Sequence, residues 1–502
     1  MSGFFYSNMR QPFKHSISQK PYIFLLIYLL IGWFTIRDYG IPSDDFTQYV
    51  IGQQNYDAIV GDKKLLDLNP EIKFYGPVFE TLCYAIDRSF PPEPPTWQKW
   101  GMRHGLIVFI FTCALGAFWF MLFNFFNTKT AWGGTMLLAY YPRIFADAHY
   151  NSKDTLFLSL IVFFLYHLYH FTISNKYKNA ILAGLWLGIA ATLRLTAFFA
   201  IPSILISILM LRKNNLAWKG FFLLFIAFIL AFYAFFPALW QHPLQEFATL
   251  VNRINHFPWP NQTLIAGRLV GPINIPFWYF PLWFFITTPL FYFILFIVGL
   301  FSTNKAQFNK PFAWIVFLFF GISLSYIILF RPNLYDAWRQ LQYMMVLFVF
   351  IGCFGIYRIS LIKTTIANIT LTIFFVYPIC ICLFLHPFQY VYFNEYYCAF
   401  NKSNTYDQDY WSISNASCMK WLDKNKTKRT IHIYTKNSNM SWLGTFFYQP
   451  TNHRFFASEI DSAKADYEIE SIRNNKPFNP KRKVVYSIIP LKDTIARIIQ
   501  LK

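Results

Sequence analysis

Two adjacent carboxylates are the first residues whose types and spacing could do chemistry. Asp44 and Asp45 lie in the sequence Ile41-Pro-Ser-Asp-Asp-Phe46, shortly after a first apolar block. Repulsion between neighbouring carboxylates can raise the pKa of one of them, which leaves a usable general base. The same residues also fit a helix cap, in which Ser43 or Asp44 precedes a helix over residues 47–59. The two interpretations are compatible, because one Asp can serve each.

A second polar segment, Tyr141–Asp154, is a short turn between two apolar blocks. A turn this short keeps its charged groups close to the membrane surface, although an ordinary solvated turn is the alternative. Asp147 and His149 could ligate a metal ion, but two ligands without a third at suitable spacing are a weak signal. The candidate residues of this turn are Arg143, Asp147, His149, Asn151, Lys153 and Asp154.

Two further segments supply arginines. Arg194 lies between apolar blocks and needs a carboxylate or a phosphate as its partner, unless its side chain extends to the membrane surface. The segment Arg331–Gln340 contains Tyr335, Asp336 and Arg339. Arg suits bidentate phosphate binding, and an internal Arg–Asp pair is the alternative.

The elements that position these residues are predicted to be membrane helices. The chain has 502 residues, of which 55% are hydrophobic and 14% charged, whereas soluble proteins carry about 25% charged residues. The apolar blocks have the length of a membrane-spanning helix. The net charge of +20 falls largely in short loops, which is a topology signal rather than the mark of a nucleic-acid partner.

Eleven apolar blocks predict eleven spans and a cytoplasmic N-terminus, with the first block retained as a span. In this arrangement the short loops that hold Lys and Arg without Asp or Glu are cytoplasmic, and all four polar segments above lie outside. A single kinked segment around Arg194 would leave ten spans and reverse the orientation of everything after it. The predicted spans are Pro21–Ile36, Gly105–Phe126, Ala131–Ala146, Thr155–Ile173, Ala180–Leu193, Thr196–Leu211, Gly220–Trp240, Tyr279–Phe301, Phe312–Phe330, Leu341–Ile356 and Ile366–Leu385.

We therefore expect two domains. Residues 1–386 form an all-α transmembrane domain with outer loops at 37–104, 147–154, 241–278 and 331–340. Residues 387–502 form a soluble extracytoplasmic domain of the small α/β type. Its strand-like runs are Thr430–Tyr434 and Val484–Ile489, its helix-like run is Ser412–Leu422, and a disulfide between Cys398 and Cys418 is compatible with an outside location.

Carboxylates and arginines together at the outer membrane surface fit one kind of reaction. Arg holds a lipid-linked phosphate, and a carboxylate takes the proton from an attacking hydroxyl group. The chain has no Gly-rich phosphate loop, so ATP is not implied. We expect a polyprenyl-phosphate sugar donor, a hydroxyl-bearing acceptor (glycan, lipid or protein) and membrane lipids as partners. No cofactor is required, and a divalent metal is compatible.

Several motifs in order resemble a known family. The acidic pair after the first span and the long outer loop resemble the GT-C fold of glycosyltransferases. The closest resemblance is to the bacterial branch of the dolichyl-phosphate-mannose-protein mannosyltransferase family (glycosyltransferase family 39). The motifs that carry it are Pro142–Ala146, Tyr150–Asp154, Tyr279–Pro289, Tyr335–Arg339 with Ala337 where the family has Gly, His386–Asn394 and Asp409–Trp411.

The resemblance implies inverting transfer of a sugar from a polyprenyl phosphate to a hydroxyl group, in the plasma membrane of a bacterium. It implies Asp44 as the base with Asp45 assisting, although the family usually has Glu at the second position. Asp154 is then a further catalytic carboxylate, and Arg143, Arg194 and Arg339 hold the donor phosphate. Asp147, His149, Lys153, Tyr335 and Asp336 remain further candidates. The resemblance ends near residue 425.

Three other functions fit parts of the pattern. A transporter or flippase of a lipid-linked glycan would also need Arg near headgroups, but it usually shows internal repeats, which this chain lacks. A membrane scaffold would have no reason to concentrate polar residues in four outer segments. A ligase that moves a whole glycan chain is hardly distinguishable from single-sugar transfer by sequence.

Overall fold

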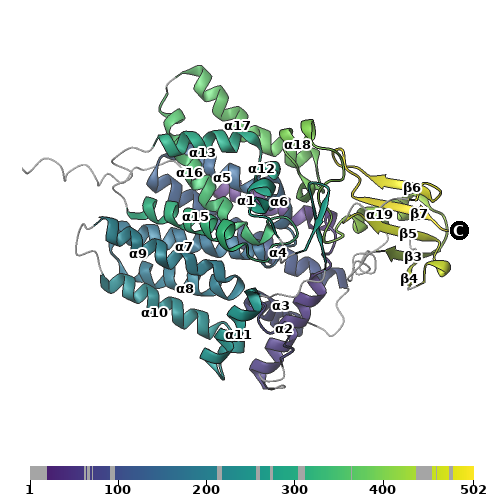
Figure 1. Ribbon diagram of the computed structural model, residues 1–502, viewed down its shortest axis with the longest axis horizontal. Coiled ribbons are helices and arrows are strands. Elements are labelled where there is room, and N and C mark those ends of the chain that lie inside the picture. The colour runs from purple at the N-terminus through teal and green to yellow at the C-terminus, as the bar shows by residue number, and fades with distance from the viewer. Residues whose placement is uncertain are drawn as a thin grey trace, which may run out of the picture.

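The computed structural model describes residues 20–61, 64, 68–70, 72–90, 96–211, 218–255, 261–271, 275–302, 311–362, 364–436, 455–459, 461–473 and 479–502. Figure 1 shows a helical body with a small sheet domain at one end, where the C-terminus lies. The predicted fold class, an all-α membrane protein with a small C-terminal α/β domain, is confirmed.

The membrane helices differ in length more than the apolar blocks suggest. In the described part of the chain, five helices are long and apolar enough to cross a membrane, and a sixth span arises if a bent pair is counted as one. The five are α4 (Thr96–Phe125), α7 (Asp154–Ser174), α15 (Pro311–Phe330), α16 (Tyr343–Ser360) and α17 (Thr365–Phe384). The other predicted spans overlap the shorter helices α1 (Tyr22–Thr35), α5 (Thr128–Ala139), α8 (Tyr177–Leu193), α9 (Ala200–Leu211) and α10 (Trp218–Ala234).

The bent pair is α12 (Tyr279–Thr287) and α13 (Leu290–Phe301), which meet at 111°. Thr288 at the bend has the extended backbone that a residue before proline prefers, and Pro289 has no amide hydrogen with which to continue the helix. The block Tyr279–Phe301 therefore folds as two short helices rather than one straight span.

The chain breaks at Arg194, as the eleven-span interpretation requires. Arg194 follows α8 with extended backbone angles (φ −148°, ψ 123°), and a short 3-10 helix, η4 (Leu195–Phe199), leads into α9. The two helices then pack on different partners, α8 on α7 and α10, and α9 on α15. The single kinked helix is thus excluded.

Small residues let α8 and α10 approach closely. A Cβ atom on Gly184 would lie 2.1 Å from the carbonyl oxygen of Leu224, so the contact tolerates no side chain. Gly188 faces Phe228 in the same way, one turn further along. Such spacing of small residues is common where membrane helices touch, and it fixes the end of α8 that carries Arg194.

The first long loop folds into α2 (Asp45–Val60) and α3 (Val78–Arg88), which pack on each other. Glu80 of α3 ties this layer to the body, because it pairs with Arg103 of α4 inside the protein and accepts a hydrogen bond from the Ser152 hydroxyl at 2.6 Å. The second long loop contains α11 (Pro243–Asn255) and the hairpin β1 (Thr263–Ile265) and β2 (Arg268–Val270). These segments cover one end of the helical body.

The C-terminal domain is a five-stranded mixed sheet in the order β4-β3-β5-β7-β6. Helix α19 (Asn415–Asn425) packs on β5 and β7. The predicted strand–helix content is therefore confirmed. The strands are β3 (Thr430–Lys436), β4 (Phe455–Glu459), β5 (Tyr467–Ser471), β6 (Lys483–Ile488) and β7 (Ala496–Gln500).

The expected disulfide between Cys398 and Cys418 is wrong. Both thiols are free, since Cys418 faces the buried core of the C-terminal domain from α19 whereas Cys398 is exposed on α18 (Glu395–Phe400).

The stretch between the two domains lies against the helical body. Asn394 donates hydrogen bonds to the carbonyl oxygens of Phe285 and Thr288 at the bend after α12. Further along, a Cβ atom on Gly40 would lie 2.4 Å from the carbonyl oxygen of Ile413. The first residues of the tail therefore hold the loop that carries Asp44. The domain boundary at residue 386 stays a prediction.

Candidate active site

Asp44 lies at the N-terminal end of α2, but its side chain does not cap that helix. Its Oδ2 instead accepts a hydrogen bond from Trp411 Nε1 at 3.0 Å and lies 3.6 Å from Arg339 Nη2. The carboxylate is 48% exposed to a cavity inside the protein. Removal from bulk water raises the pKa of Asp44; Arg339 opposes this, and Asp336 adds to it. The group is suited to accept a proton from a bound hydroxyl.

Asp45 faces another way. Its Oδ2 lies 2.9 Å from His104 Nε2 of α4, and both side chains are buried. This contact anchors the first turn of α2 on α4. Asp45 still borders the cavity, but its partner commits the carboxylate to holding the helix. Of the two predicted functions for the acidic pair, Asp44 therefore has the geometry of a base and Asp45 that of an anchor.

Asp154 joins the arginines of two distant segments. Its Oδ1 accepts from Arg194 Nη2 at 2.5 Å and Nε at 3.1 Å, and its Oδ2 accepts from Arg339 Nη1 at 3.1 Å. The side chain is 1% exposed. Asn151 in the preceding turn caps α7 through the Asp154 amide and also donates to Asp154 Oδ2 at 3.2 Å. Asp154 is thus fully engaged and orients the two guanidinium groups.

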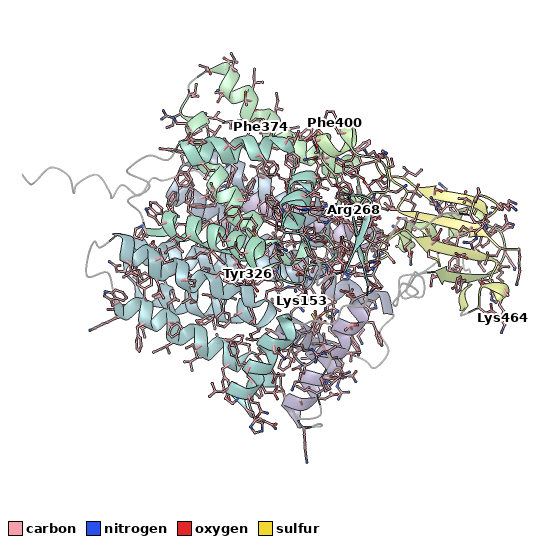
Figure 2. The ribbon with its side chains drawn as sticks, viewed as in Figure 1. Lys153, Arg268, Tyr326, Phe374, Phe400 and Lys464 are labelled. Atoms are coloured by element: carbon pink, nitrogen blue, oxygen red, sulfur yellow. The ribbon has the colours of Figure 1, made fainter. Side chains whose placement is uncertain are left out.

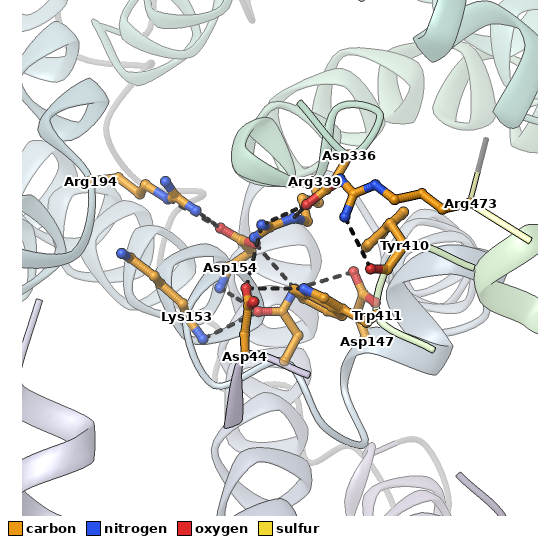
Figure 3. Close-up of polar contacts among 11 residues, drawn as sticks. Asp44, Asp147, Lys153, Asp154, Arg194, Asp336, Arg339, Tyr410, Trp411 and Arg473 are labelled. Atoms are coloured by element: carbon orange, nitrogen blue, oxygen red, sulfur yellow. Dashed lines mark hydrogen bonds and ion pairs between the residues drawn. The ribbon is translucent and has the colours of Figure 1, made fainter. Parts of the chain in front are cut away.

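Arg339 contacts three carboxylates at once (Figure 3). Besides Asp44 and Asp154, its Nη2 lies 3.0 Å from Asp336 Oδ2, and its guanidinium lies 4.6 Å from the ring centre of Trp411. Asp336 and Ala337 both have positive φ, 56° and 60°, which L-residues rarely adopt. The turn before Arg339 is therefore under backbone strain, and the ion pairs hold it in place.

The cavity has a polar and an apolar part. The polar part is lined by Asp44, Lys153, Arg194, Arg339 and Trp411, among others. It borders an apolar cavity of about 360 Å³ between η4, α11 and α15, and the two share four residues. A groove along α15 shares Phe199 and Tyr326 with the apolar cavity, as Figure 2 helps to locate. The four shared residues are Tyr75, Lys153, Arg194 and Tyr335.

Lys153 lies at this junction. Its Nζ lies 4.1 Å from the ring centre of Tyr75, and among the described residues no carboxylate forms an ion pair with it. Burial lowers the pKa of Lys153, and the nearby Arg194 lowers it further. An anion bound at the junction would favour the charged amine. Lys153 is therefore the cation of the site most open to a phosphate.

Three predicted residues lie away from the cavity lining. Arg143 is buried and donates through Nε to the Tyr392 carbonyl oxygen at 3.0 Å, with its guanidinium beside the rings of Trp283 and Phe393. It holds the tail segment against the helical body. The geometry therefore does not bring Arg143 to the other two phosphate candidates.

His149 and Asp147 are also buried. His149 Nε2 lies 3.0 Å from Thr35 Oγ1 and its Nδ1 2.8 Å from the Phe145 carbonyl oxygen, and burial lowers the pKa of His149 to about 4. Burial raises the pKa of Asp147 to about 6, and its Oδ2 accepts from Gln342. In the part of the chain that the structure describes, no group of three or more His, Cys, Asp or Glu side chains could hold a metal ion.

Two contacts of the site escaped the sequence interpretation. Trp411 lies in a motif that the resemblance includes, but nothing in the sequence connects its indole to a residue 367 positions away. Arg473, from the loop after β5, forms an ion pair with Asp336. It lies in the part of the chain that no motif covers, so no local signal could have indicated it.

Comparison with known proteins places the chain in a family context. Residues 97–240 match the family model described as dolichyl-phosphate-mannose-protein mannosyltransferase. The family resemblance is confirmed. The segment matched to this mannosyltransferase family holds Arg143, Lys153, Asp154 and Arg194, whereas Asp44 and Arg339 lie outside it. No curated protein sequence matches the chain.

Solved structures give distant matches over most of the chain. ArnT from Cupriavidus metallidurans in the apo state is 9% identical, with 95% of this chain and 97% of that chain covered and a TM-score of 0.49. The same ArnT bound to undecaprenyl phosphate gives a TM-score of 0.48 at the same identity and coverage. The oligosaccharyltransferase AglB from Archaeoglobus fulgidus, in complex with an inhibitory peptide and a dolichol-phosphate, is 10% identical, with 89% and 69% covered and a TM-score of 0.43.

Proposed function

We propose that the chain transfers a sugar from a polyprenyl-phosphate donor to a hydroxyl acceptor, with Asp44 as the general base. The observation that carries this proposal is the position of Asp44 in a polar cavity continuous with an apolar one, with cations at the junction. A lipid-linked sugar needs this combination, because its phosphate, its apolar chain and its sugar require three different environments.

The donor would bind across the junction. Lys153 meets the phosphate, and Arg194 and Arg339 add positive charge from the side that Asp154 holds. The polyprenyl chain fills the apolar cavity beside Phe199 and Tyr326 and leaves along the groove of α15. The sugar then lies in the polar part, next to Asp44.

The reaction is a single displacement. The acceptor hydroxyl oxygen attacks the anomeric carbon while its proton passes to Asp44. The bond between that carbon and the phosphate oxygen breaks, and its electron pair stays on the lipid phosphate. Cations already in place stabilise this developing charge without reorganisation. One displacement inverts the configuration at the anomeric carbon.

The proposal includes a membrane orientation. Lys and Arg without Asp or Glu in the short loops, such as the pair Lys176 and Lys178, favour a cytoplasmic N-terminus. The active site and the C-terminal domain are then on the non-cytoplasmic face, in the plasma membrane of a bacterium. Labelling of single cysteines in the C-terminal domain of intact cells with a membrane-impermeant reagent tests this, and protection of that domain would contradict it.

The function is tested with purified protein in vesicles and a labelled polyprenyl-phosphate sugar. Asp44→Asn removes the base and should slow transfer by about 10²–10⁴-fold. Asp38→Asn is the matched control, since Asp38 lies in the same loop and pairs with His386 and Lys420 away from the cavity; it should retain transfer. Full activity of Asp44→Asn, or lipid movement across the bilayer without sugar transfer, would contradict the proposal. The lipid-linked sugar that accumulates in cells lacking the protein identifies the donor.

A further inference from the structure

The C-terminal domain contributes a side chain to the ion-pair network of the site. Arg473 follows strand β5 of that domain, and its Nη2 pairs with Asp336 Oδ1. Its Nη1 lies 3.4 Å from the Tyr410 carbonyl oxygen. Asp336 is 4% exposed and Arg473 25%, so this pair is shielded from solvent more than an ordinary surface ion pair. The contact joins a soluble sheet to a turn of the membrane domain.

Asp336 divides its two oxygens between two arginines. Oδ1 faces Arg473, whereas Oδ2 accepts from Nε and Nη2 of Arg339 at 3.3 Å and 3.0 Å. Figure 3 shows the two arginines reaching Asp336 from opposite sides. The position of the carboxylate therefore depends on both partners, and a change at Arg473 is transmitted to Arg339.

The backbone makes this dependence strong. Asp336 and Ala337 hold left-handed conformations next to each other, which cost free energy unless the surroundings fix them. Arg473 attaches the side chain of this strained turn to the sheet. Without it, the turn can relax, and Arg339 loses its alignment with Asp154 and Asp44.

We propose that Arg473 is a positioning residue, through which the C-terminal domain holds Asp336 and thereby aligns Arg339 in the membrane-domain site. This goes beyond the proposed function, which needs only the membrane-domain residues, yet it rests on that function for its kinetic consequence. The C-terminal domain is then part of the active unit rather than an appendage.

The test compares Arg473→Gln with Arg482→Gln in the full-length protein. Arg482 lies in the same domain and pairs with buried Glu468, at a similar exposure of 23%, but its ion pair does not touch the site. For Arg473→Gln we expect KM for the polyprenyl-phosphate sugar to rise about tenfold, the effect of losing about 1.4 kcal/mol of coupling within one ion-pair network. Arg473→Lys should restore part of the loss, and Arg482→Gln should leave KM unchanged.

A pH profile separates positioning from mere stability. Groups facing Asp44 are Arg339, Asp336, Trp411, Arg473 and Lys153. Because Arg473 lowers the pKa of Asp44, Arg473→Gln should move the acid limb of the rate profile to higher pH. Arg482→Gln should not move it, even if it lowers the melting temperature equally.

Binding of undecaprenyl phosphate alone, in lipid nanodiscs, distinguishes the two proposals. If the wild type binds the lipid and Arg473→Gln binds it about tenfold more weakly, the positioning proposal is supported. Equal binding and equal KM for Arg473→Gln and wild type would overturn it, as would the same loss in Arg482→Gln. If the wild type neither binds nor transfers, the proposed function fails. The thermal stabilities of Arg473→Gln, Asp336→Asn and the double variant then decide: non-additivity supports the coupling, and additivity overturns it.

Discussion

Arg339 donates to Asp154 at 3.1 Å across 185 positions of sequence. The contact joins the turn after α15 to the first residue of α7, two segments that no local signal connects. Because Arg194 meets the other oxygen of Asp154, this one buried carboxylate sets the distance between two guanidinium groups. A pair of arginines held apart in this way leaves room for an anion between them and Lys153.

Asp154→Asn should therefore damage the site without removing the base. The neutral amide cannot balance two arginines, and breaking one side of a buried ion pair costs about 3–5 kcal/mol. We expect KM for the donor to rise at least tenfold and the melting temperature to fall. Asp461→Asn, a loop-cap variant in the C-terminal domain, is the control. A variant at Asp154 with wild-type KM would show that the two arginines need no common partner.

Lys153→Met tests the phosphate contact. The substitution keeps the apolar stem and removes the charge, so α7 should remain folded while the donor loses one charge-assisted contact of about 1.5–3 kcal/mol. KM for the lipid donor should rise about 10–100-fold with little change in melting temperature. Lys176→Met, in the turn before α8, should leave KM unaltered. If both variants behave alike, Lys153 does not meet the phosphate.

The pH dependence follows from the raised pKa of Asp44. The base works as the carboxylate, so transfer falls as pH drops through that pKa, and the acid limb should lie above the ordinary range of an Asp. Asp336 contributes to the rise, so Asp336→Asn should move the limb to lower pH. The rate of transfer against pH for the two proteins checks the sign. A limb that moves to higher pH in Asp336→Asn would contradict the electrostatic argument.

Ala337 should tolerate Gly but not Val. At φ 60° a β-branched side chain is strongly disfavoured, whereas Gly adopts this conformation freely. Gly gains from the relieved strain and loses a buried methyl group of about 0.8 kcal/mol, so its net effect on stability should be near zero. Val should cost more than about 2 kcal/mol and lower donor affinity through Arg339. Thermal unfolding in detergent ranks the three proteins, and equal stability of Val and Gly would show that the turn is not strained.

Much of the site could be predicted from polar residues in an apolar sequence, because a charge between membrane helices needs a partner. Asp44, Asp154, Arg194 and Arg339 were each identifiable in this way, and they meet. Arg143 and His149 satisfied the same criterion and yet hold segments together. Their partners are backbone carbonyl oxygens and aromatic rings, which leave no charge pattern in the sequence.

The division of labour within the acidic pair was not predictable. Asp44 and Asp45 are neighbours, and only the direction of α2 sends one side chain to the cavity and the other to His104. Span number was overestimated by length criteria for a similar reason. Thr288 and Pro289 interrupt an unbroken apolar block with a bend that hydropathy does not register.

The modest size of the apolar cavity and the open groove on α15 have a consequence for the carrier. The cavity encloses only the part of the lipid next to the phosphate, and the remainder lies along a surface that faces the bilayer. Bilayer lipids already provide an apolar environment for every further isoprene unit. Under the proposed function, the protein therefore measures the head of its donor closely and its length hardly at all, so carriers of different length should compete almost equally for one site.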